Sequence, residues 1–133
     1  MPIDKQAFPF PLTAAFVAIL ENEIAKSGFQ EGGRVILNFR DPNYSSETGG
    51  FHPVEISVSS WRKIEYVTDF AFVGIGPFAE LAKEIDFDVS LGLFQHFGRE
   101  FRLVAGEELF AIWQENFVTY HQMGVYSVTV QEA

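Results

Sequence analysis

The sequence predicts an α+β fold in which two helices pack on a twisted antiparallel sheet of about six to seven strands. Apolar residues recur at helical spacing near the N-terminus and again in the C-terminal region. Between these two segments the chain consists of short runs in which apolar and polar residues alternate. Gly, Pro, Asn and Ser separate the runs, which is typical of turns between antiparallel strands.

A length of 133 residues predicts a single domain over residues 1–133, because a second core would not fit. Hydrophobic residues make up 47% of the chain, and fifteen of them are phenylalanine, enough large apolar surface for a small core. Residues 1–11 are rich in proline, so we expect an extended N-terminal arm. Phe8 and Phe10 would anchor this arm to the core or to a neighbouring subunit.

The first helix is predicted over residues 13–27, with Thr13 as its N-cap and Gly28 in the position of a C-terminal glycine. Alternation then predicts three strands, with a hairpin turn around Ser59 and Ser60 between the second and the third. The three predicted strands cover residues 35–40, 54–59 and 64–72.

Gly74 to Pro77 interrupts the alternation, and residues 78–83 are predicted as a short turn of helix or an irregular edge. Further strands are expected at 85–89 and 93–97, and residues 101–104 form a short sixth strand or an extended lead-in. A second helix follows at about 106–122, and a β-branched strand ends the fold at 125–130. The aromatic stripe of this helix is interpreted as helix-to-sheet core, with an oligomer interface as the alternative: Phe110, Trp113, Phe117 and Tyr120.

The formal net charge of −9 argues against nucleic acid and anionic membrane as partners, because both require clustered Lys and Arg. It permits a basic protein partner, or it serves only to keep the protein in solution. The chain has no cysteine, no run of about 18 apolar residues and no secretory signal pattern, so a cytoplasmic protein is expected.

The loop between the first two strands combines Asp-Pro, Asn, Ser and Gly-Gly, a composition typical of turns. An EF-hand loop that started at Asp41 would need glycine at Ser46 and glutamate at His52, so calcium binding is not predicted. The alternative is a partner-binding loop, in which Tyr44, Glu47 and Phe51 are the candidate contacts.

Asp86 and Asp88 project from the same face of one strand, and we expect Asp69 on the same face of a neighbouring strand. Such carboxylates can share a proton and act in acid–base catalysis. A solvated sheet face is the more ordinary interpretation, and a surface for a basic partner is the alternative. All three residues are therefore candidate partner contacts.

No motif predicts a catalytic, cofactor or metal site. His52, His96 and His121 have no metal-ligand or nucleophile spacing, and no Gly-x-Ser-x-Gly motif is present. Gly74-x-Gly76 lacks the third glycine and the following helix of a dinucleotide-binding turn, so it is interpreted as a turn at the end of a strand.

Three long blocks of the sequence are distinctive: NFRDPNYSSETGGFHPVEI, YVTDFAFVGIGPFAELAKEIDFD and LFAIWQENFVTYHQMGVYSVTV. Together they resemble a family of uncharacterised bacterial proteins known mainly from Vibrio and related bacteria, some of them encoded on pathogenicity islands. That family is similar in fold to the acidic mitochondrial matrix proteins that bind the globular heads of a complement component, and the family has no assigned catalytic residues. This chain departs from the mitochondrial proteins because it is shorter, lacks long acidic insertions and has a strand as its last predicted element.

The leading hypothesis is a non-enzymatic module that binds a basic, or host- or phage-related, protein partner. The alternative is a small-molecule-binding or enzymatic domain with a pocket between the curved sheet and a helix. In that domain Asp69 or Asp86 would act with His96. A structural subunit that forms a homo-oligomer is a third option.

Overall fold

The computed structural model describes residues 2–29 and 32–133. Two helices and three short 3-10 turns accompany seven strands, with these bounds: α1 (Ala14–Ser27), β1 (Val35–Arg40), β2 (Val54–Val58), β3 (Ile64–Val73), β4 (Glu80–Asp88), β5 (Leu93–His96), β6 (Arg99–Arg102), α2 (Glu107–Gln122), β7 (Ser127–Glu132), and 3-10 turns at Lys5–Ala7, Gly76–Phe78 and Leu103–Gly106.

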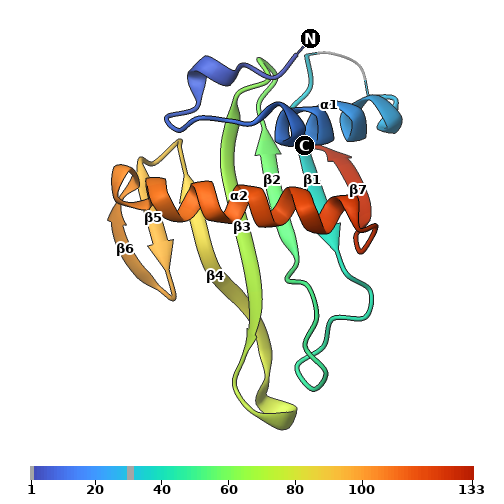
Figure 1. The fold of residues 1–133 in the computed structure, drawn as a ribbon, viewed down its shortest axis with the longest axis vertical. Coiled ribbons are helices and arrows are strands. Elements are labelled where there is room, and N and C mark those ends of the chain that lie inside the picture. The colour runs from blue at the N-terminus through green and yellow to red at the C-terminus, as the bar shows by residue number, and fades with distance from the viewer. Residues whose placement is uncertain (1, 30–31) are drawn as a thin grey trace.

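The strands form one antiparallel sheet in the order β6-β5-β4-β3-β2-β1-β7. Six strands follow one another as a meander, and β7 returns beside β1 after α2 has crossed the sheet. Figure 1 shows both helices in front of the same face of the sheet, with α2 running across the strands. The predicted fold class is therefore confirmed.

The core lies between the helices and the sheet and is dominated by phenylalanine. Phe16 of α1 is fully buried, and its ring contacts the rings of Phe110, Trp113 and Phe117 of α2 edge-on, at centroid distances of 5.7–6.3 Å. Edge-to-face packing lets the positive ring edges meet the negative ring faces. Tyr120 is only half-buried, so three of the four residues in the predicted aromatic stripe belong to the core.

The N-terminal arm lies against α2. The buried rings of Phe8 and Phe10 contact the Phe110 ring at 5.0 and 5.6 Å. The buried amide of Gln114 accepts a hydrogen bond from the Thr13 backbone N–H (2.9 Å) and donates one to the Pro11 carbonyl (3.2 Å). One side chain therefore satisfies two backbone groups at the junction of the arm and α1.

The caps of α1 agree with the sequence analysis. Thr13 Oγ1 accepts a hydrogen bond from the Phe16 N–H, and Gly28 ends the helix with φ 75°, a conformation that favours glycine.

The prediction for residues 78–83 was wrong from Glu80 onward, because β4 starts there. Val73 pairs with Glu80, so β3 and β4 form a long hairpin whose pairing outweighs the weak alternation of the sequence.

Truncating Phe16 tests the aromatic core. Phe16→Ala is expected to lower the free energy of unfolding by about 3–5 kcal/mol, because it leaves a cavity among three rings. Phe78→Ala is the control, since that ring is 85% exposed, and its effect should stay within about 0.5 kcal/mol. Urea denaturation followed by circular dichroism measures both, and similar losses in the two variants would contradict the assigned core.

Candidate functional site

A polar cluster interrupts the apolar interface between α2 and the sheet. It consists of His52 just before β2, Asp69 of β3, Glu84 of β4 and Trp113 of α2. The side chains of Asp69 and Glu84 are only 13% and 18% exposed, and that of His52 is 38% exposed. Four separate segments of the chain therefore contribute polar atoms to one small volume.

The register of β2 and β3 positions His52 against Asp69. Val54 pairs with Asp69, and the Phe70 N–H donates to the Pro53 carbonyl (2.9 Å), which extends the pairing beyond β2. Because side chains alternate between the two faces, His52 lies on the same face as Val54, two residues away. Its ring is therefore a diagonal neighbour of Asp69 across the strand pair.

A β-bulge in β4 brings Glu84 to the same place. Asp69 pairs with Ile85, whereas Phe70 pairs with Lys83, so Glu84 is the extra residue of the bulge. Bulges turn a side chain away from regular alternation, and here the Glu84 carboxylate reaches the face that the helices cover. Regular pairing would have directed it to the opposite face.

One imidazole nitrogen serves two carboxylates in this cluster. His52 Nδ1 lies 3.0 Å from Asp69 Oδ1 and 2.7 Å from Glu84 Oε2. When Nδ1 carries a hydrogen, it can donate it to Asp69, and Glu84 Oε2, although buried and 2.7 Å from the same nitrogen, then has no hydrogen-bond partner of its own among the described residues. The second oxygen of Asp69 accepts a hydrogen bond of 3.0 Å from Trp113 Nε1.

The two carboxylates raise the pKa of His52 above 6.5. The hydrogen bond to Asp69 is the largest cause, and burial opposes it by disfavouring the charged ring. The charges of Asp69 and Glu84 add to the increase. When it is protonated, His52 places one positive charge beside these two partly buried acids.

A pocket of about 280 Å³ adjoins the cluster beneath α2. Burial raises the pKa of Tyr126 well above its ordinary value, so this lining residue remains a neutral hydroxyl. The wall is mainly aromatic and holds one acid: Gly50, Phe51, His52, Asp69, Trp113, Asn116, Phe117, Tyr120 and Tyr126.

A larger groove, of about 550 Å³, lies on the outer side of α2, and we call it the α2 groove. Its floor is apolar and comes from the N-terminal arm, the start of α1 and α2, whereas three exposed glutamates stand along it. No Lys or Arg of the described residues lines it. The lining residues are Phe10, Pro11, Thr13, Ala15, Glu107, Glu108, Phe110, Ala111, Gln114, Glu115, Val118 and Thr119.

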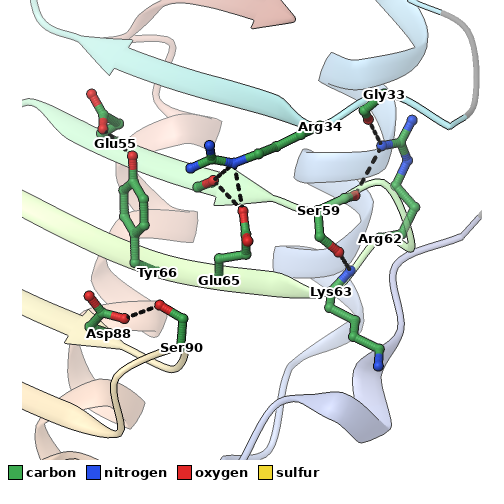
Figure 2. Close-up of polar contacts among 11 residues, drawn as sticks. Gly33, Arg34, Glu55, Ser59, Arg62, Lys63, Glu65, Tyr66, Asp88 and Ser90 are labelled. Carbon is green, nitrogen blue, oxygen red and sulfur yellow. Dashed lines mark hydrogen bonds and ion pairs between the residues drawn. The ribbon is translucent and has the colours of Figure 1, made fainter. Parts of the chain in front are cut away.

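The sheet face opposite the helices carries ion pairs and hydrogen bonds (Figure 2). Glu65 lies there because a second bulge makes it the extra residue opposite Ser57 and Val58, and it forms an ion pair of 2.8 Å with Arg34. Tyr66 donates a hydrogen bond to Glu55 on this face. These carboxylates already have partners within the protein.

The structure separates the three predicted aspartates. Asp69 is on the helix-covered face, whereas Asp86 and Asp88 are on the opposite face, so the expected common face was wrong. The reason is the register, which pairs Asp69 with Ile85 and Asp86 with Thr68. Asp86 is buried and accepts a hydrogen bond from Thr68 Oγ1 (2.7 Å), and Asp88 accepts hydrogen bonds from the Ser90 hydroxyl and the Leu91 N–H.

The three loop candidates also differ from one another. Tyr44 stacks near His52 and Phe72, and its hydroxyl accepts a hydrogen bond from the Phe72 N–H, so it has a packing role. Phe51 contacts Tyr120 at 4.7 Å and lines the 280 Å³ pocket. Glu47 is exposed on the loop.

The positions of His52, Glu84 and Trp113 in the sequence do not predict that they form one cluster. A signal existed for His52, because a hairpin turn near Ser59 and Ser60 places the segment before β2 beside Asp69. No sequence signal marks the bulge that aims Glu84. The pairing of Asp69 with His96 that the alternative hypothesis proposed is replaced by pairing with His52.

One imidazole and two carboxylates are ligand types that hold divalent metal ions in proteins. One nitrogen atom and two oxygen atoms of His52, Asp69 and Glu84 lie within 4.8 Å of one another. The same groups can also exchange a proton through Nδ1. Both uses require access from the adjoining pocket.

The fold and these surfaces define a class: an α+β protein with a seven-stranded antiparallel sheet, two helices on one face and a small polar pocket beneath α2. The chain belongs to the family described as protein of unknown function, DUF2787, whose model matches residues 14–131. The resemblance noted in the sequence is therefore confirmed.

Two solved structures are similar to this chain, each with a TM-score of 0.78 over 92% of this chain and 95% of its own. One is a hypothetical protein from the VSP-II pathogenicity island of Vibrio cholerae and is 30% identical. The other is 35% identical, a conserved hypothetical protein from the VPI-2 pathogenicity island of the same species, described as sharing structural homology with the human P32 protein.

None of these descriptions assigns an activity, and the search of curated proteins found no match. Within residues 2–29 and 32–133, neither helix has the length and apolarity needed to cross a membrane.

The raised pKa of His52 predicts a pH-dependent contribution to stability. The pKa is higher in the folded state than the unfolded value of 6.5, so the contribution is complete below pH 6.5 and is lost as the pH rises through the folded pKa. The stability difference between the wild type and His52→Gln should therefore shrink as the pH rises from below 6.5 through the folded pKa of His52. Urea denaturation in EDTA buffer measures this difference.

The double variant Asp69→Asn, Glu84→Gln supplies the control, because it removes both acids that hold the proton. In that background only burial acts on the pKa of His52, and burial lowers it, so the effect of His52→Gln should no longer shrink as the pH rises. A decrease with rising pH that persists there would show that other groups set the protonation of His52.

Proposed function

We propose that this protein is a non-enzymatic binding module for a basic protein partner and that the α2 groove receives an amphipathic, basic segment of that partner. The observation that carries the proposal is the composition of the groove. It combines an apolar floor with three exposed glutamates and no Lys or Arg among the described residues. This combination matches a helix with one apolar and one basic face.

The size and shape of the groove support a peptide segment over a small polar molecule. The groove is about twice as large as the pocket beside Asp69, at about 550 Å³ against about 280 Å³, and its exposed wall is mostly apolar. Ile112 lies next to Glu108 and Glu115 on the same stripe of α2 and is 59% exposed. The apolar lining of the groove, rather than this single side chain, is the kind of exposed apolar surface that is typical of interaction sites.

The distribution of charge supports a partner segment whose basic face lies at the rim of the α2 groove. Residues 103–133 contain four glutamates and neither Lys nor Arg, and three of these glutamates line the groove. Their field would steer a basic segment to α2 and hold its charged face at the rim, while apolar side chains fill the floor. The carboxylates on the open sheet face contribute less because Arg34 and Lys83 pair with two of them.

A small-molecule-binding or enzymatic domain is the second candidate, and the pocket beneath α2 favours it. Asp69 points into this pocket beside His52, whereas Asp86 lies on the opposite face of the sheet. A volume of about 280 Å³ suits a few heavy atoms rather than a drug-sized ligand.

A designed peptide tests the binding module. The probe is a fluorescein-labelled Leu/Lys peptide of about 18 residues, roughly 27 Å long as a helix, with leucines on one face. Fluorescence anisotropy should show saturable binding that weakens as salt increases, because paired charges are screened. A scrambled peptide of the same composition controls for net charge. Equal binding of both peptides would contradict the proposal that the α2 groove binds an amphipathic helix.

Charge reversal identifies the binding face. Glu115→Lys should weaken peptide binding by about tenfold or more, since it removes one attraction and adds one repulsion. Glu80→Lys makes the same change in net charge at an exposed position on β4, away from the groove, so it should have a clearly smaller effect. Ala111→Trp fills the floor without a change in charge and should also weaken binding. Equal effects of Glu115→Lys and Glu80→Lys would show that the peptide binds by non-specific charge attraction and not in the α2 groove.

A further inference from the structure

We propose that His52, Asp69 and Glu84 form a binding site for one divalent transition-metal ion, with Zn²⁺ as the preferred ion. The sequence analysis expected no metal site, because the three ligands come from separate segments and share no motif. The proposal is independent of the α2 groove, so either site can fail in experiment without the other.

The positions of the donor atoms carry the proposal. His52 Nδ1, one oxygen of Asp69 and one oxygen of Glu84 all lie within 4.8 Å of one another. Zinc bonds to nitrogen and oxygen of about 2.0–2.2 Å place tetrahedral ligands about 3.3–3.5 Å apart. The distance from Nδ1 to Asp69 Oδ1 (3.0 Å) needs to grow by about 0.3–0.5 Å, and the distance from Nδ1 to Glu84 Oε2 (2.7 Å) by about 0.6–0.8 Å.

Charge and hydrogen bonding favour an ion over a proton at this place. A proton on Nδ1 that hydrogen-bonds to Asp69 leaves Glu84 Oε2 buried without a hydrogen-bond partner in residues 2–29 and 32–133. Two carboxylates with one imidazolium also keep a net charge of −1, whereas a divalent ion with neutral imidazole brings the cluster to zero. His52 is the cationic side chain within 4.0 Å of either acid in the part of the chain that the structure describes.

The surroundings hold the ligands in place. Trp113 Nε1 donates a hydrogen bond to Asp69 Oδ2, so Oδ1 is the free ligand oxygen. The Tyr44 ring packs 5.3 Å from the His52 ring. The β4 bulge fixes the backbone at Glu84. Outer contacts of this kind orient ligands in metal sites, and their loss lowers metal affinity about 10–100-fold.

The ligand set selects the ion and leaves room for exchange. Mg²⁺ and Ca²⁺ prefer oxygen ligands alone, whereas imidazole suits Zn²⁺ and its neighbours in the transition series. Three protein ligands leave a fourth tetrahedral position, and His52 and Asp69 also line the 280 Å³ pocket. Water or a small anionic ligand would take that position, as in zinc sites with three protein ligands.

Calorimetry with metal-free protein tests the site. Tag-free protein is treated with EDTA, dialysed and titrated with ZnCl₂ at neutral pH, and MgCl₂ serves as the comparison ion. We expect one Zn²⁺ per chain and no comparable binding of Mg²⁺. Absence of stoichiometric zinc binding would overturn the proposal.

Variants locate the bound ion. Glu84→Gln keeps the shape of the side chain and should lower zinc affinity at least tenfold, and His52→Gln should do the same. Trp113→Phe keeps the ring but removes the indole N–H, so it should weaken zinc binding about tenfold through the orientation of Asp69. Circular dichroism confirms that each variant is folded.

His96→Gln and His121→Gln are the controls, because these histidines lie outside the cluster and each variant removes one imidazole. Zinc affinity should be unchanged in both. If zinc binding persists in Glu84→Gln and His52→Gln but is lost in a control variant, the ion binds elsewhere and the proposed site is wrong. If no variant changes it, the binding is adventitious and the proposed site is equally wrong.

Discussion

The hydrogen bond between Trp113 and Asp69 links the two parts of the interface between α2 and the sheet. The Trp113 ring packs on Phe117 and Phe16 in the apolar part, and its N–H reaches the carboxylate that His52 also contacts. A carboxylate on the buried face of a sheet is costly unless donors surround it. The indole and the imidazole supply those donors, and the indole hydrogen bond attaches α2 to β3 at this point.

The position of α2 in turn creates both candidate sites. Its inner side closes the aromatic pocket over Asp69, and its outer side forms the α2 groove with the N-terminal arm. Gln114 attaches the arm to α2 through the Thr13 N–H and the Pro11 carbonyl, so the wall of the groove has a defined backbone position. The groove is therefore a product of tertiary packing, although most of its charge is encoded in one helix.

The sequence predicted the elements well where a local physical signal exists. Thr13, Gly28 and the helical stripes marked α1 and α2, and alternation marked most strands. The face of Asp69 and the position of Glu84 were not predictable in this way, because strand register and bulges depend on pairing with distant residues. Asp86 looked like a solvated acid in a strand, yet Thr68 on β3 provides its buried partner.

The distribution of charge explains why the two sites can have different roles. Arg34 pairs with Glu65 and Lys83 with Asp86, and protonated His52 offsets one of the two charges of Asp69 and Glu84, so these acids contribute less to the distant field than unpaired ones. The glutamates of α2 have no cationic residue between positions 103 and 133 to balance them except a protonated histidine. Screening by salt weakens exposed charges far more than a partly buried cluster. Association with a basic partner would therefore depend on ionic strength, whereas the occupant of the buried cluster would depend chiefly on competition between a proton and a metal ion.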